Sequence, residues 1–131
     1  MTNVYVLVVD DEPHIRHVVS LKLRAAGIAC EQASQGLEAL DIVRVRAPAL
    51  VVTDYQMPGM DGLQLSRALV AESTTARAPV LLLTARGHRV PPSELAGTNI
   101  QQVIDKPFSP RQLIETIREL LDAASAAERA A

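Results

Sequence analysis

The most constraining feature of the sequence is a repeated alternation between short apolar runs and segments with the apolar spacing of a helix. The runs are Val4–Val9, Ile28–Ala33, Ala49–Thr53, Val80–Leu83 and the partly polar Ile100–Ile104. Apolar runs without alternation are typical of strands buried on both faces of a parallel sheet. Strands that alternate with helices predict right-handed crossovers and helices on both faces of that sheet. We therefore expect an α/β fold of five strand and helix units.

Prolines and glycines predict where several helices begin and end. The first helix is expected from Pro13, which suits the first helical position, to the break at Gly27. Prolines interrupt the segment after the fourth strand, so we expect the fourth helix to be short and to start near Pro92 or Ser93. Beyond Asp122 the chain is alanine-rich with little apolar periodicity, and a tail is expected there.

Length and composition narrow the class of protein. A chain of 131 residues with 48% hydrophobic and 21% charged residues suits one globular domain with a substantial core. A net charge of -2 gives no general attraction for nucleic acid or for an anionic membrane, and no stretch resembles a signal peptide or a membrane span. The single cysteine, Cys30, cannot form an internal disulfide. We expect a protein of the cytoplasm.

Polar side chains stand at the carboxyl ends of four of the five predicted strands. Asp10 and Asp11 follow the first strand, Asp54 the third, Thr84 the fourth, and Lys106 the fifth. The carboxyl ends of parallel strands meet at one edge of the sheet, where ligands bind. Three neighbouring carboxylates repel one another and need a compensating cation, for which Mg²⁺ is suited. A hydroxyl and an ammonium nearby favour phosphoryl transfer, for which an aspartate can be the nucleophile.

Four motifs carry a resemblance to a known family. They are Asp10–Asp11, Asp54–Gly62, Thr84–Ala85 and Lys106–Phe108. In combination and order they resemble the receiver domains of two-component signalling, over nearly the whole chain up to Asp122. The resemblance implies a flavodoxin-like, doubly wound five-stranded parallel sheet with strand order 2-1-3-4-5. It implies a receiver domain over residues 1–122, with residues 123–131 as an alanine-rich tail or the start of a linker.

The resemblance also implies a phosphoacceptor and a metal site. Asp54 would accept a phosphoryl group from a sensor histidine kinase or a histidine phosphotransfer protein. Mg²⁺ would be held by Asp11, Asp54 and the backbone carbonyl of Gln56, with Asp10 acting through a metal-bound water. Such a domain is a signalling module that phosphorylates and dephosphorylates itself, and it is not a turnover enzyme.

The remaining implied roles concern switching and partners. Lys106 would pair with the phosphoryl oxygens, Thr84 would reorient toward them, and the Lys106–Pro107 peptide would be cis. The first helix would be the docking surface for the phosphodonor, with His14, Ile15 and Val18 near the site. A downstream effector protein or domain would receive the signal, while this chain itself would contact neither nucleic acid nor membrane.

Two departures from the family pattern concern the output. Val103 stands three residues before Lys106, where the family has Tyr or Phe, so coupling between that aromatic and the threonine cannot operate in the usual form. The segment from Gly87 to Gly97 replaces a regular fourth helix. Arg86 and Gln56 occupy positions that tune autodephosphorylation in such domains.

Each site residue also has an interpretation without chemistry. The acidic residues 10–12 could cap the helix that begins at Pro13, and Asp54 or Thr84 could belong to ordinary turns. Lys106 could be a solvated surface charge. Together, however, these interpretations require independent coincidences at successive strand ends of one sheet.

Two other functions share part of the pattern. A metal-dependent phosphohydrolase with an aspartyl nucleophile would need a second acid two residues after Asp54, where Gln56 stands. A flavin- or nucleotide-binding module would need a glycine- or hydroxyl-rich loop after the first strand. The acidic residues 10–12 would repel its phosphate.

Overall fold

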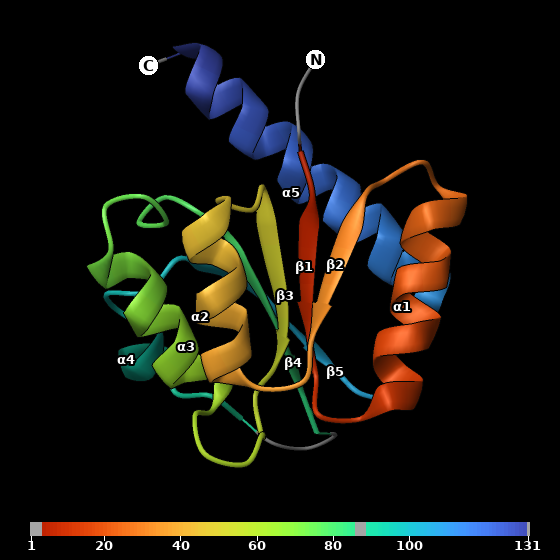
Figure 1. Ribbon diagram of the computed structural model, residues 1–131, viewed down its shortest axis with the longest axis horizontal. Coiled ribbons are helices and arrows are strands. Elements are labelled where there is room, and N and C mark those ends of the chain that lie inside the picture. The colour runs from red at the N-terminus through yellow and green to blue at the C-terminus, as the bar shows by residue number, and fades with distance from the viewer. Residues whose placement is uncertain (1–3, 86–88, 131) are drawn as a thin grey trace.

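The computed structural model describes residues 4–85 and 89–130, and its centre is a five-stranded parallel sheet (Figure 1). The strands are β1 (Val6–Val9), β2 (Cys30–Ala33), β3 (Leu50–Asp54), β4 (Val80–Thr84) and β5 (Ile100–Asp105). Their order in the sheet is β2-β1-β3-β4-β5, and every neighbouring pair is parallel. The predicted fold class and strand order are therefore confirmed.

Helices cover both faces of the sheet. They are α1 (Pro13–Ala25), α2 (Gly36–Val45), α3 (Gly62–Ala71), α4 (Pro92–Leu95) and α5 (Pro110–Ala130). Helices α1 and α5 contact each other on one face, and α2 and α3 contact each other on the opposite face (Figure 1). This is the doubly wound arrangement that the alternating pattern predicts.

Alternating strand residues build two cores, one on each face. In β1, Leu7 belongs to the core under α2 and α3, whereas Val6 and Val8 belong to the core under α1 and α5. All four residues of β1 and all five of β3 are buried. Because both faces are packed, the carboxyl ends of these two strands have fixed positions at the edge that carries the polar residues.

Two helices test the expectations for irregular segments. Helix α4 begins at Pro92 and ends at Leu95, as its prolines predict. The sequence predicts a tail after Asp122, but α5 continues to Ala130. Alanine has the highest helix propensity, so a helix can persist after its apolar periodicity ends. The domain boundary at Asp122 stays a prediction.

Candidate functional site

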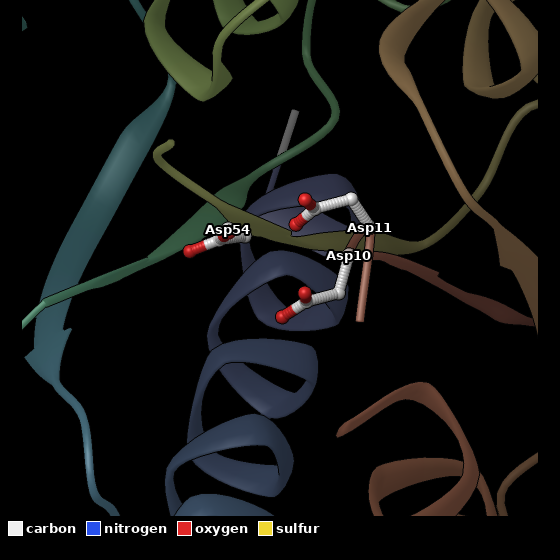
Figure 2. A group of neighbouring side chains, drawn as sticks. All are labelled: Asp10, Asp11 and Asp54. Atoms are coloured by element: carbon white, nitrogen blue, oxygen red, sulfur yellow. The ribbon is translucent and has the colours of Figure 1, made fainter. Parts of the chain in front are cut away.

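Three carboxylates meet at the carboxyl edge of the central strands. Asp10 and Asp11 follow β1, and Asp54 is the last residue of β3. Each offers an oxygen, and these oxygens lie within 4.8 Å of one another (Figure 2). Asp10 and Asp54 are only 1% and 6% exposed, whereas Asp11 is exposed. The structure thus brings together the acidic residues that the sequence singled out.

The register of the two strands explains this proximity. Val9 pairs with Thr53 across the parallel β1 and β3 strands, so Asp10 and Asp54 are the next residues along each strand. Both strands are completely buried, which leaves the acids little freedom to move apart. Packing of apolar residues therefore holds like charges at close range.

The start of α3 supports the end of β3. A Cβ at Gly62 would lie 2.5 Å from the carbonyl oxygen of Asp54 and 2.7 Å from a methyl carbon of Leu82, so only glycine allows this close approach. Asp61 caps the helix: its carboxylate accepts from the Gln64 backbone N–H at 2.8 Å, and the Gln64 side chain accepts from the Asp61 N–H at 2.9 Å. The loop after Asp54 is thereby tied to a fixed helix end.

The Lys106 ammonium lies among these acids. Its Nζ is 2.9 Å from Asp10 Oδ2 and 3.2 Å from Asp54 Oδ1, and a longer contact of 3.6 Å reaches Glu12 Oε1. The backbone N–H of Lys106 donates to the Thr84 carbonyl oxygen at 2.7 Å, and the Lys106–Pro107 peptide is cis, as expected. Lys106 is therefore part of a buried charge network and not a solvated surface charge.

The charges are only partly balanced, and the pKa values reflect this. Burial, and then the negative charge of Asp10, raise the pKa of Asp54 to about 6, although Lys106 opposes the change. Burial also raises the pKa of Asp10 above its ordinary value. Burial lowers the pKa of Lys106, but bonding to Asp10 and Asp54 outweighs it, so the net pKa is raised and the ammonium stays charged. The Lys106 ammonium thus faces more carboxylates than a single positive charge can balance.

The donor set fits a hard divalent cation. Asp10, Asp11 and Asp54 offer only oxygen ligands, and one ammonium cannot neutralise three carboxylates. These are the residues that would hold Mg²⁺. Gln56 is exposed on the loop after β3, and the part of its carbonyl in metal binding stays a prediction.

Thr84 has a partner that the sequence analysis did not assign. Its hydroxyl is buried and donates to Asp105 Oδ1 at 3.0 Å. The two residues are paired across β4 and β5 at the ends of these strands. Their shared position after two predicted strands was the signal that could have identified this contact, and the same reasoning could have paired Glu12 with Lys106.

The helix-capping interpretation of the acidic segment does not hold. Glu12 is at the N-cap position of α1, but its side chain makes no capping hydrogen bond. Asp10 Oδ1 accepts from the Glu12 backbone N–H at 2.9 Å, a contact outside the helix. His14 and His17 are both exposed on α1. Arg86 lies outside the described residues.

Comparison with known proteins identifies the family. Residues 6–118 match the family model described as "Response regulator receiver domain". The chain is 33% identical over 116 residues to the phosphate regulon transcriptional regulatory protein PhoB of Pseudomonas aeruginosa, covering 88% of this chain and 51% of that protein. It is 39% identical over 118 residues to the probable transcriptional regulator ycf27 of Porphyra purpurea, covering 88% of this chain and 46% of that protein. The chain thus spans about half the length of these curated relatives.

Solved structures agree with this match. The chemotaxis response regulator CheY4 of Vibrio cholerae is 31% identical, with a TM-score of 0.82 over 91% of this chain and 99% of that one. NtrX of Brucella abortus is 27% identical, with a TM-score of 0.88 over 98% of this chain and 29% of that one. The sequence match, the strand order and the structural similarity lead to one conclusion: this chain belongs to the response regulator receiver domain family.

Proposed function

We propose that this chain accepts a phosphoryl group on Asp54 from a sensor histidine kinase or a histidine phosphotransfer protein, in a Mg²⁺-dependent reaction. The observation that carries the proposal is the position of the Asp54 carboxylate, 3.2 Å from the Lys106 ammonium and grouped with Asp10 and Asp11. A nucleophile, a fixed cation and a set of metal ligands are what phosphoryl transfer requires.

The reaction forms one bond and breaks one bond. An Asp54 oxygen attacks the phosphorus of the phosphohistidine, the P–N bond breaks, and the imidazole leaves with its electron pair and takes up a proton. Asp54 must be ionised to attack, and a pKa of about 6 leaves it mostly ionised at pH 7. When bound, the divalent ion supplies positive charge that offsets the carboxylates and the phosphoryl oxygens.

Lys106 and Thr84 are the residues proposed to contact the phosphoryl group once Asp54 is phosphorylated. The Lys106 ammonium is held at the site by Asp10 and is positioned to pair with phosphoryl oxygens. Thr84 lies one residue beyond Leu83, which pairs with Asp54 across β3 and β4. Its hydroxyl is the donor that would reorient toward the phosphoryl group.

The proposed partners are those that a phosphoacceptor on Asp54 requires. Helix α1 begins beside the acids and presents the exposed His14 next to the half-buried Ile15 and Val18, so it is the proposed docking surface for the phosphodonor. A downstream effector protein or domain would receive the signal. We place the protein in the cytoplasm, with no direct role for this chain in binding nucleic acid. Among the described residues, no helix is long and apolar enough to cross a membrane.

Intact-mass spectrometry tests the phosphoacceptor directly. With Mg²⁺ and a small-molecule phosphodonor, the wild-type chain should gain the mass of one phosphoryl group, and chelation of the metal should prevent this. Asp54→Asn should gain none, because an amide is not a nucleophile for this reaction. A control, Asp41→Asn, removes an exposed acid on α2 and should leave the gain unchanged. Equal mass gain by Asp54→Asn and wild type would reject the assignment.

Lys106→Ala tests the role of the ammonium. The structural changes that the phosphodonor causes in wild type should be largely lost in this variant. The fold should persist, because the Lys106 side chain contacts the carboxylates of the site and belongs to neither apolar core. Lys22→Ala removes an exposed cation from α1 and serves as the matched control. If Lys106→Ala unfolded the protein, a purely functional role for this lysine would be wrong.

A further inference from the structure

The contact between Thr84 and Asp105 links the candidate site to the outer strand of the sheet. Thr84 is 0% exposed, and its hydroxyl donates to Asp105 Oδ1 at 3.0 Å. Asp105 itself is exposed, so its carboxylate reaches inward to this hydroxyl from the surface. A buried donor at the site is therefore held by a surface acid.

A threonine hydroxyl has a single proton to donate. In the described structure, that proton is directed at the Asp105 carboxylate, and bonds to a charged acceptor are stronger than neutral ones. A phosphoryl group on Asp54 would bring three strong acceptor oxygens and additional negative charge. Asp105 and the phosphoryl group would then compete for the same proton.

The backbone couples the two acceptors to one another. Asp105 directly precedes Lys106, whose N–H donates to the Thr84 carbonyl at 2.7 Å and whose ammonium lies 3.2 Å from Asp54 Oδ1. Val103, two residues before Asp105 on the same face of β5, pairs with Leu82 and has no side-chain group that can bond a hydroxyl. Asp105 is thus the β5 side chain that engages Thr84.

We propose that Asp105 is a positioning residue that holds the Thr84 hydroxyl in the unphosphorylated protein and must release it when Asp54 is phosphorylated. The inference rests on the proposed function, because it needs a phosphoryl group at Asp54. Release would leave an exposed carboxylate on β5 without its intramolecular donor. Phosphorylation of the buried Asp54 would thereby change the exposed surface of β5.

Binding of beryllium fluoride, a phosphoryl mimic, tests the proposal. Its affinity in the presence of Mg²⁺ would be measured by calorimetry for wild type, Asp105→Ala, Asp105→Asn, Thr84→Val and the double variant Thr84→Val/Asp105→Ala. Removing the competing acceptor should tighten binding by Asp105→Ala about tenfold, equivalent to about 1.4 kcal/mol. Asp105→Asn keeps an acceptor without the charge and should fall between wild type and Asp105→Ala.

The double variant separates the hydrogen bond from general electrostatics. With Thr84→Val as the background, Asp105→Ala should change the affinity less than twofold, because there is no hydroxyl to release. An equal gain with and without the hydroxyl, or no gain from Asp105→Ala, would overturn the proposal. If wild type failed to bind beryllium fluoride at all, the phosphoacceptor function would fail instead, which is a distinguishable result. Asp105→Asn, with nearly the same shape as the native residue, keeps the test available if Asp105→Ala does not fold.

Discussion

The central strands and the outer strand of this sheet differ sharply in how they are built. Every residue of β1 and β3 is buried, and the carboxyl ends of these strands carry the three clustered acids. Strand β5 has no fully buried residue, contains three polar residues among its six, and is preceded by α4, a helix of 4 residues without a buried side chain. Yet β5 carries Asp105 and leads directly to Lys106.

The difference shows how the protein combines fixed and adjustable parts. Carboxylates that repel one another need rigid support, and the two apolar cores around β1 and β3 provide it. A group that must give up a hydrogen bond is better placed where little packing opposes the change. Asp105, exposed on the outer strand and bonded to Thr84, meets that condition.

The largest expected effect is at the junction of β3 and α3. Gly62→Ala would place a methyl group 2.5 Å from the Asp54 carbonyl oxygen, and backbone must shift to relieve the clash. We expect a loss of about 3 kcal/mol in the free energy of unfolding, together with weaker Mg²⁺ binding. In Gly36→Ala the closest group is the flexible Met60 side chain, so the loss should be smaller. Urea unfolding with and without Mg²⁺ measures the free energy of unfolding of the two variants. Similar losses in Gly62→Ala and Gly36→Ala would mean that the junction of β3 and α3 is not especially rigid.

The burial of Asp54, together with the negative charge of Asp10, predicts a pH dependence of stability. The pKa of Asp54 is raised from 3.8 to about 6 in the folded chain, so the folded state binds more protons than the unfolded state between about pH 4 and pH 6. Stability contributed by protonated Asp54 is therefore present at low pH and is lost as pH rises through this window. In the absence of metal, the free energy of unfolding of Asp54→Asn relative to wild type should rise by up to about 3 kcal/mol as the pH increases through this window. Above the window it should rise no further. A constant difference between the two proteins across this pH range would show that the pKa of Asp54 is not raised in the folded chain.

Matched valine substitutions compare the two regions directly. Val52 in β3 is 0% exposed, so Val52→Ala should lower the free energy of unfolding by about 2 to 3 kcal/mol through lost burial and a residual cavity. Val103 in β5 is half-buried, and Val103→Ala should lower it by about 1 kcal/mol or less. Chemical denaturation provides both values. Equal losses would show that β5 is as tightly packed as the central strands.

The smallest expected effect concerns the exposed partner of Lys106. The Glu12 side chain is 62% exposed and lies 3.6 Å from Nζ, a geometry in which ion pairs contribute little. Glu12→Gln should change the free energy of unfolding by less than about 0.5 kcal/mol. A loss above about 1 kcal/mol in thermal or urea unfolding would show that the stability of the protein depends on the contact between Glu12 and Lys106.

Several parts of the architecture follow from the sequence alone. Unbroken apolar runs such as Val80–Leu83 are typical of strands buried on both faces of a parallel sheet, and prolines limit α4 to a short segment from Pro92. Strand ends share one edge in such a sheet, so the approach of Asp10 to Asp54 could be anticipated. The motifs are specific enough to indicate the family from the sequence alone.

The tertiary structure decided what depends on contacts between distant residues. The sequence places Asp105 next to Lys106, but only the register of β4 and β5 brings it to Thr84, because pairing across strands is set by packing and not by local order. The pKa of Asp54 likewise depends on burial and on neighbouring charges, and both exist only once the chain has folded.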